Sequence, residues 1–298
     1  MSIAAENPVL PRALAAIELA CAQAGLDPAG ARLMRDYANL VYELPGENVV
    51  LRLAEAATPG KYERLLTSVR VTRWLIEQDF PAVRPLEVRQ PIAAEGFFVT
   101  FWYHEGHVGP LPEPAALGAM LRHLHALPQV PFDLPTYDPF GSVRRAIDAC
   151  RVLTLEDRAW LVERCSVLAE SYYERLEFGL PYGLIHGDAH RGNLLRTSGR
   201  LLLCDWDSVS AGPREIDLAP TLTGVRFGLT EQQRQAFCDA YGYDMTAWPG
   251  YPVLRDMREL QTLTAVLRNA HRDPRAHEEL RLRLTSLQAG DDRPWNAF

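Results

Sequence analysis

The C-terminal half of the sequence holds five side chains whose types and spacing could bind a metal ion and move a proton: His186, Asp188, Asn193, Asp205 and Asp207. Carboxylate and amide oxygens are hard ligands, and magnesium takes a few of them while phosphate oxygens and water complete its shell. A carboxylate can also accept a proton from a hydroxyl nucleophile. The group therefore predicts a site where a magnesium-bound phosphate meets a hydroxyl group.

A predicted β-hairpin explains how two of these side chains could meet. Residues 194–196 and 201–204 are apolar apart from Arg196 and have the lengths of its two arms. Asn193 directly precedes the first arm and Asp205 directly follows the second, so antiparallel pairing of the arms would bring them close. We therefore expect Asn193 and Asp205 to share a metal ion, while Asp188 stays available as a general base.

The N-terminal part of the sequence contains both helix and strand patterns. Helical spacing of apolar residues covers residues 8–24 and 61–78. Alternating or aromatic-rich segments predict strands at residues 31–36, 40–44, 48–53, 83–89 and 96–103. We expect these strands to form a five-stranded antiparallel sheet with one packed helix.

After a stretch rich in glycine and proline at residues 109–114, the sequence becomes mostly helical. Helical patterns cover residues 114–126, 142–149 and 155–178, and most of the chain after residue 214. Antiparallel strands with helices segregated from them define an α+β fold. We expect an N-terminal lobe over residues 1–104 and a larger, mainly helical lobe over residues 105–298.

The composition disfavours several classes of protein. The net charge of −7 leaves no basic face for nucleic acid or an anionic membrane. No apolar run reaches the ~18 residues that a membrane span needs, and the first ten residues lack the features of a signal peptide. The five cysteines are scattered and form no C-x-x-C pair, which favours reduced thiols. We expect a cytoplasmic protein with neither nucleic acid nor membrane as a partner.

The order of the motifs resembles the aminoglycoside phosphotransferase and choline-kinase-like branch of the protein-kinase fold. The His-Gly-Asp, Asn and Asp-Trp-Asp motifs within residues 186–207 match its central signature in kind and spacing. Residues 121–125 and 212–219 resemble two further elements of that family. The resemblance covers most of the chain and is weakest at the N-terminus. It implies a two-lobed kinase-like fold and transfer of the ATP γ-phosphoryl group, with Mg²⁺, to a hydroxyl of a small molecule.

The resemblance assigns a role to each residue of the central signature. Asp188 would be the catalytic base, and Asn193 and Asp205 would be magnesium ligands. Three residues would have supporting roles: His186, Asp207 and Asp217. Of these, His186 and Asp217 would hold the catalytic loop, whereas Asp207 could assist the metal or face the acceptor. His125, on an apolar helical face, is expected to be a packed and hydrogen-bonded core histidine.

In the N-terminal lobe, the resemblance points to residues that would bind the nucleotide. Residues 36–42 take the place of the loop over the phosphates, and Asn39 lies at a position often used in small-molecule kinases. Arg52 takes the place of the lysine that pairs with phosphate, although a planar guanidinium binds phosphate differently from an ammonium. The main chain around Phe101 and Tyr103 would meet adenine.

The surroundings of Arg52 leave one question open. Strand alternation should turn Arg52 away from the face that carries Leu51 and Leu53. The glutamate that this family places on the following helix falls near Ser68, so the sequence does not define a carboxylate partner for Arg52. Lys61, the only lysine of the chain, is expected to be solvated at a helix start.

The acceptor is predicted only as a class. An antibiotic of the aminoglycoside or nucleoside type is the first choice, and an amino alcohol, amino sugar or sugar of metabolism is the alternative. A nucleotide-binding regulatory protein without turnover is a hypothesis of another class. A protein kinase is disfavoured because residues 207–212 are too few to hold an activation segment.

Overall fold

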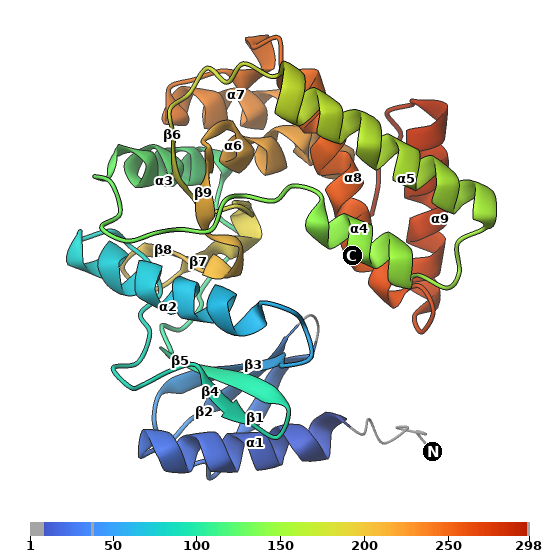
Figure 1. Cartoon of the computed structure of the whole chain (residues 1–298). Coiled ribbons are helices and arrows are strands. Elements are labelled where there is room, and N and C mark those ends of the chain that lie inside the picture. The colour runs from blue at the N-terminus through green and yellow to red at the C-terminus, as the bar shows by residue number, and fades with distance from the viewer. Residues whose placement is uncertain (1–8, 37–38, 297–298) are drawn as a thin grey trace. The chain divides into compact units, whose positions relative to one another are not determined.

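The computed structural model describes residues 9–36 and 39–296 (Figure 1). The chain forms two compact units. Unit 1 holds the described residues up to Leu111 together with Val130–Phe132 and Gly192–Val209, and unit 2 holds the remainder. The predicted lobe boundary after residue 104 stays a prediction. None of the helices in the described part combines the length and apolar composition of a membrane span.

Unit 1 is built on a five-stranded antiparallel sheet, as predicted. Its strands are β1 (Arg32–Asp36), β2 (Leu40–Leu44), β3 (Val49–Glu55), β4 (Ile92–Ala94) and β5 (Phe97–Tyr103). They lie in the order β1-β2-β3-β5-β4.

One of the predicted strands is wrong. Residues 83–89 form no regular strand and contribute an isolated bridge between Pro85 and Trp102, while the fifth strand is β4. Pro85 has no N–H to donate to a ladder, so the apolar pattern around it cannot be continued as a paired strand.

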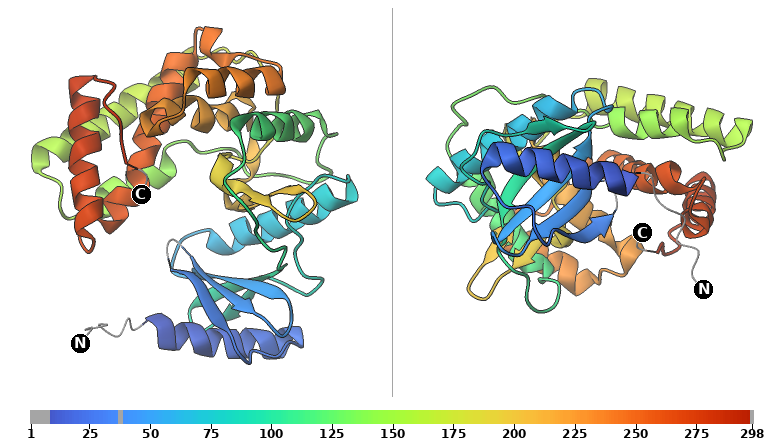
Figure 2. Two further views of the ribbon diagram at one scale, coloured as in Figure 1. Left: turned by 180° about the vertical axis from the view of Figure 1, so that it is seen from behind. Right: turned by 90° about the horizontal axis from the view of Figure 1, so that it is seen from below.

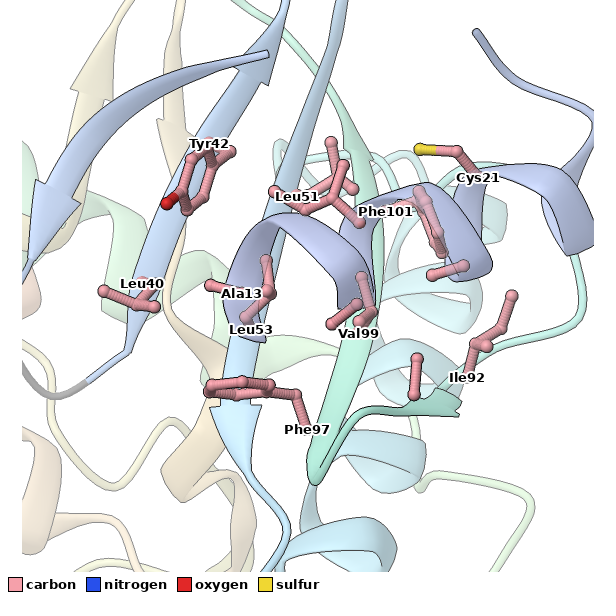
Figure 3. Packing of buried hydrophobic residues seen from close by; sticks show 14 of the residues in the cluster. Ala13, Cys21, Leu40, Tyr42, Leu51, Leu53, Ile92, Phe97, Val99 and Phe101 are labelled. Carbon is pink, nitrogen blue, oxygen red and sulfur yellow. The ribbon is translucent and has the colours of Figure 1, made fainter. Parts of the chain in front are cut away.

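Each face of the sheet is covered by a helix, where one packed helix was expected. Helix α1 (Val9–Ala24) packs on the face that carries Leu51, Val99 and Phe101 (Figure 3). Its position across the strands is clear in the view from below (Figure 2). Helix α2 (Lys61–Glu77) covers the other face, where the Tyr62 ring lies 5.3 Å from that of Phe98.

Unit 1 also contains the predicted hairpin, formed by β7 (Leu194–Arg196) and β8 (Leu201–Leu203). Leu203 fixes this hairpin to the segment after α2. Its N–H donates to the carbonyl of Pro81 at 2.8 Å, and its carbonyl accepts from the N–H of Val83 at 3.1 Å. The hairpin is therefore held to the same unit as the sheet by main-chain hydrogen bonds.

Unit 2 is mainly helical. Its helices are α3 (Pro114–Ala126), α4 (Gly141–Ala149), α5 (Leu155–Glu170), α6 (Glu215–Leu222), α7 (Glu231–Tyr241), α8 (Tyr251–Asn269) and α9 (Pro274–Ala289). Helix α8 packs against α4, α5, α6 and α9 (Figures 1 and 2). The predicted helix over residues 155–178 is shorter, since α5 gives way to a π-helical turn at Ser171–Arg175.

Two short strands of unit 2 carry the segments that matter for function. Strands β6 (Tyr182–Ile185) and β9 (Ser210–Pro213) pair antiparallel, with Ile185 opposite Ser210. Because β6 ends at the fully buried Ile185, the residue that follows it starts from a fixed point in the core.

Gly118→Ala should destabilise unit 2 because α3 and α7 approach closely at this glycine. A Cβ at residue 118 would lie 2.5 Å from the carbonyl oxygen of Phe237, which is backbone and cannot swing away. Overpacking of this kind costs about 1–3 kcal/mol, against a gain of up to ~1 kcal/mol in helix propensity. A thermal unfolding measurement checks this. Gly199→Ala is the control, since a Cβ there meets nothing within 4 Å, and equal melting temperatures would contradict the packing argument.

Candidate active site

The loop after β6 is held by a buried carboxylate. His186 is fully buried, and its N–H donates to Asp217 Oδ2 at 2.7 Å. The N–H of Gly187 donates to Asp217 Oδ1 at 2.8 Å. Gly187 has φ of +81°, a conformation that favours glycine. Both oxygens of Asp217 therefore fix the backbone that leads to Asp188, which matches the expected position of Asp217 beside the loop.

His125 secures Asp217 from the other side. Its Nε2 lies 3.1 Å from Asp217 Oδ2, and its Nδ1 lies 2.9 Å from the hydroxyl of Tyr241. His125 and Asp217 are both buried. The prediction of a packed, hydrogen-bonded core histidine is confirmed.

His186 also contacts the loop that it begins. Its Nδ1 accepts a hydrogen bond from the N–H of Asp188 at 3.3 Å. This contact, together with the Asp217 bonds, fixes the main chain on both sides of Gly187. The main chain that carries the Asp188 side chain is therefore held in one conformation by hydrogen bonds.

Asp188 has an ion-pair partner that the sequence did not indicate. Arg258 of α8 places NH2 2.9 Å from Asp188 Oδ1, and His190 Nε2 lies 4.0 Å from Oδ2. Burial raises the pKa of Asp188, but the Arg258 guanidinium and the nearby imidazoles of His190 and His186 outweigh it and hold that pKa below its ordinary value. Asp188 is therefore an ionised carboxylate.

In unit 1 the hairpin brings the two expected metal ligands to neighbouring strand ends. The N–H of Cys204 donates to the carbonyl of Asn193 at 2.9 Å, so Asn193 lies opposite the residue that precedes Asp205. Asp205 has φ of +66°, which an aspartate tolerates better than most residues. Asn193 is buried and Asp205 is partly exposed.

Arg52 lies in a compact charge cluster with two carboxylates. Its NH1 and NH2 each donate to Asp207 at 3.1 Å, and NH2 also donates to Asp205 Oδ1 at 3.2 Å. The side chain is 16% exposed and points away from the face that carries Leu51 and Leu53, as strand alternation predicted. Burial lowers the pKa of Arg52, but Asp207 and Asp205 more than compensate and raise it above its ordinary value.

Lys61 belongs to the same cluster. Its Nζ donates to Asp207 Oδ2 at 3.0 Å, and its side chain is only 15% exposed. The expectation that Lys61 is solvated is therefore wrong. Helix α2 begins at Lys61 on the sheet face to which Arg52 points, so a helix-start position does not imply exposure here. Burial raises the pKa of Asp207, but Arg52 and Lys61 hold it below its ordinary value.

These contacts answer the question of the carboxylate partner of Arg52. Asp207, which follows β8, pairs with Arg52 through both carboxylate oxygens, and Asp205 adds a further contact. Ser68, at the expected helix position, is buried, and Glu63 is exposed. Two cations and two carboxylates thus meet in unit 1, since Asp205 and Asp207 face Arg52 and Lys61.

The main-chain N–H groups of Phe101 and Tyr103, which were expected near adenine, are hydrogen-bonded within unit 1. Phe101 donates its N–H to Gln90 Oε1 at 2.7 Å and accepts at its carbonyl from Leu86, so its main chain is already used within unit 1. The N–H of Tyr103 donates to Arg84. These bonds count against adenine contacts through these groups. Asn39 lies directly before β2, and the neighbouring residues 37–38 fall outside the described part.

The oxygen atoms of Asn193 and Asp205 suit a hard cation whose remaining ligands are not protein side chains. Within the described residues, no group of three or more His, Cys, Asp and Glu side chains is arranged to hold a metal ion. Asn193 and Asp205 offer one amide and one carboxylate from adjacent strand ends. A pair of hard oxygens suits magnesium that also carries phosphate oxygens and water.

The chain belongs to the phosphotransferase enzyme family, which its residues 30–257 match. This match spans most of the 298 residues and confirms the predicted resemblance and the kinase-like α+β fold. The protein is thus a phosphotransferase. A comparison with curated proteins found no match.

Solved structures with the same fold include kinases for different acceptors. Amicoumacin kinase hAmiN, in complex with AMP-PNP, Ca²⁺ and Ami, has a TM-score of 0.72 at 15% identity, covering 98% of this chain and 96% of that chain. A choline/ethanolamine kinase family protein from Mesorhizobium loti has a TM-score of 0.60 at 18% identity, covering 94% and 93%. Aminoglycoside phosphotransferase APH(3'')-Id from Streptomyces rimosus has a TM-score of 0.61 at 18% identity, covering 84% and 98%. At these identities the likeness shows the fold alone.

Proposed function

We propose that the protein transfers the γ-phosphoryl group of ATP, with Mg²⁺, to a hydroxyl group of a small molecule. The observation that carries this proposal is the braced loop in which Asp217 holds His186 and Gly187, so that Asp188 projects from a rigid turn. A positioned carboxylate can orient a hydroxyl group and take its proton as the phosphorus–oxygen bond forms. Family membership supports the reaction class.

We assign nucleotide binding to unit 1 and the reacting acceptor hydroxyl to Asp188 in unit 2. Asn193 and Asp205 would hold the metal ion, which when bound neutralises charge on the β- and γ-phosphates. Arg52 would contact the phosphates while Asp207 keeps it oriented, and Lys61 would add a second positive charge beside it. His186 and Asp217 would keep the loop of Asp188 in place.

The adenine contact is proposed for the main chain of residues 105–107, since the N–H of His104 already donates to the carbonyl of Asn48. These residues come shortly after β5, whereas the main chain of Phe101 is engaged with Gln90 and Leu86. Asn39, before β2, remains the proposed contact near the phosphates. Because ATP is a cytoplasmic metabolite, we also propose a cytoplasmic location. None of the five cysteines, all in the described part, forms a disulfide, as expected in a reducing compartment.

An antibiotic is the proposed acceptor class. Similar structures include an amicoumacin kinase, an aminoglycoside phosphotransferase and a spectinomycin phosphotransferase. A metabolic amino alcohol, amino sugar or sugar is the second candidate, since a choline/ethanolamine kinase family protein and choline kinase LicA from Streptococcus pneumoniae share the fold. The regulatory alternative without turnover is not retained, because the chain belongs to an enzyme family.

A coupled ADP-release screen tests the proposal. The panel holds aminoglycosides, nucleoside antibiotics, macrolides, amino sugars and choline, each with ATP and Mg²⁺, and hits are verified by mass spectrometry as a phosphate ester. The Asp188→Asn variant runs beside the wild type. ADP release that needs an acceptor, Mg²⁺ and Asp188 supports the proposed function. Binding of ATP and Mg²⁺ without transfer to any class of acceptor would contradict it.

Removing the Lys61 charge should weaken nucleotide binding. A solvated lysine, as expected from the sequence, would have had no such effect. Lys61→Met keeps most of the apolar stem but deletes the charge beside Asp207. We expect a rise of about 5- to 20-fold in the dissociation constant of ATP, the size of one partly screened charge contact with phosphate. Equilibrium binding measured by calorimetry checks this.

Two further variants serve as controls for the Lys61→Met measurement. Lys61→Arg should restore much of the affinity because it keeps a positive charge. Arg70→Met is the control and should leave the affinity unchanged, since Arg70 is an exposed cation of α2 that lies 4.4 Å from the ring centre of Phe132. Equal affinities for wild type and Lys61→Met would show that Arg52 supplies the phosphate contact alone.

A further inference from the structure

Arg258 is held against Asp188 by a helix whose position is fixed on both sides of it. Glu259, the next residue of α8, accepts hydrogen bonds from the Arg226 guanidinium at both carboxylate oxygens, at 2.8 and 2.9 Å. Both side chains are buried. Two residues further on, Gln261 Nε2 donates to the hydroxyl of Tyr137 at 3.0 Å. The direction in which Arg258 leaves the helix is thus set by core contacts of its neighbours.

Each carboxylate of α8 and of the loop at residues 186–191 is engaged by an arginine. Across the described residues of α8 and the loop at residues 186–191, the acidic side chains are Asp188, Asp256 and Glu259. Asp256 is paired with Arg164 at 2.6 Å and with Arg255 at 2.8 Å. Asp188 and Glu259 are paired with Arg258 and Arg226. These two segments therefore present no carboxylate that lacks an arginine partner, and they add His190 beside Asp188.

This pattern is unfavourable for an acceptor with several positive charges. A polycation gains affinity from carboxylates that it can pair with, and it is repelled by cations within a few ångströms. At Asp188 the carboxylate charge is already balanced at 2.9 Å, so an ammonium group beside the reacting hydroxyl would meet Arg258 and would have to displace it.

We infer that Arg258 is a positioning residue for Asp188, and that the ion pair selects hydroxyl compounds without positive charge beside the reacting hydroxyl. This inference rests on the proposed function, in which Asp188 receives the hydroxyl proton. Within the proposed antibiotic class it favours a nucleoside type over a polycationic aminoglycoside. Arg258 holds the Asp188 carboxylate in one orientation and keeps it ionised. The hydroxyl group of the substrate can then donate its hydrogen bond to a carboxylate oxygen whose position is fixed.

The ion pair has a defined effect on the titration of Asp188. Burial raises the pKa of Asp188, while Arg258, His190 and His186 lower it. Tyr137 also lies near this carboxylate, but burial raises its own pKa to about 12, so it stays protonated in an assay. Without Arg258, burial would be less opposed and the pKa of Asp188 would rise. The acidic limb of the pH–rate profile would then move to higher pH.

Titration of the full-length protein tests the positioning role without knowledge of the acceptor. The carboxyl carbon-13 resonance of Asp188, identified by its loss in Asp188→Asn, is followed with pH. We expect Arg258→Gln to move its midpoint to higher pH, Arg258→Lys to restore most of the wild-type midpoint, and Arg255→Gln to change nothing. Arg255 lies on the same helix and pairs with Asp256 instead. An unchanged midpoint in a folded Arg258→Gln protein overturns the inference.

The choice of acceptor is tested with probes of different charge. Wild type, Arg258→Gln and Arg255→Gln are each given ATP and Mg²⁺ with uridine, an uncharged nucleoside, or kanamycin, a polycationic aminoglycoside. We expect wild type to favour uridine, and Arg258→Gln to raise the kcat/KM ratio of kanamycin to uridine by about five- to tenfold, the effect of one like charge in a partly screened site. The Arg255→Gln ratio should equal that of wild type.

The outcomes separate this inference from the proposed function. Efficient phosphorylation of kanamycin by wild type, with a ratio that Arg258→Gln does not change, overturns the selection by charge while the proposed function stands. Absence of transfer to any acceptor overturns the proposed function itself, whatever the Arg258 variants do. Transfer that persists in Asp188→Asn overturns only the role of Asp188 as the base, and with it the inference about Arg258.

Discussion

Replacing Asp188 by asparagine should abolish phosphoryl transfer while ATP binding stays nearly unchanged. The residue is proposed to take the acceptor proton, and a positioned general base commonly supplies ~10²–10⁴-fold in rate. Asparagine has the same shape and can still accept the hydrogen bond from Arg258, but it has no charge with which to accept a proton. The measurement is kcat with the best acceptor of the screen, beside calorimetric titration with ATP and Mg²⁺.

The control for this experiment is the same chemical change at a remote site. Asp239 is exposed on α7 and accepts a side-chain hydrogen bond from Gln235. Asp239→Asn should leave both kcat and ATP affinity at wild-type values. If Asp188→Asn retained more than about a tenth of the wild-type kcat, Asp188 would not be the base.

Asp205→Asn should remove most of the magnesium-dependent part of ATP binding, and the double variant with Asn193→Ala should be little worse. Asparagine is chosen because Asp205 has a positive φ, which asparagine tolerates and alanine does not. Loss of residues that merely support a metal ligand costs 10–100-fold in metal affinity, so loss of the ligand charge should cost at least about tenfold. ATP titrations over a range of Mg²⁺ concentrations measure this.

Non-additivity is the diagnostic part of that experiment. When two residues bind the same ion, the loss in affinity of the double variant is smaller than the sum of the two single losses. Losses at independent residues add. Ser198→Ala, an exposed change in the turn of the same hairpin, should leave the Mg²⁺ dependence unaltered. Fully additive effects of Asp205→Asn and Asn193→Ala would mean that the two side chains do not share a metal ion.

The local elements could be predicted because their causes are local. The hairpin of β7 and β8 follows from two mainly apolar arms around a short turn, and it places Asn193 opposite Cys204, the residue before Asp205. The helical spacing of α2 and the alternation around Arg52 were also read correctly. The strand predicted over residues 83–89 is the exception. That prediction rested on side-chain alternation and did not weigh Pro85, which has no N–H to donate to a strand ladder.

The sequence by itself determined the family and the order of the motif residues, because His186, Asp188, Asn193 and Asp205 lie within one short stretch with fixed spacing. Only the tertiary structure decided which charges face them. Arg52 and Asp207 are 155 positions apart, and Lys61 reaches the same carboxylate from the start of a helix.

Arg258 likewise meets Asp188 only because α8 packs in the core of unit 2. Such pairs depend on how distant elements pack, which hydrophobic burial sets for the whole unit at once. An arginine on a helix has no local pattern that names its partner. The order of the motifs is therefore written in the sequence, whereas the charges that surround Asp188 and Arg52 are a property of the fold.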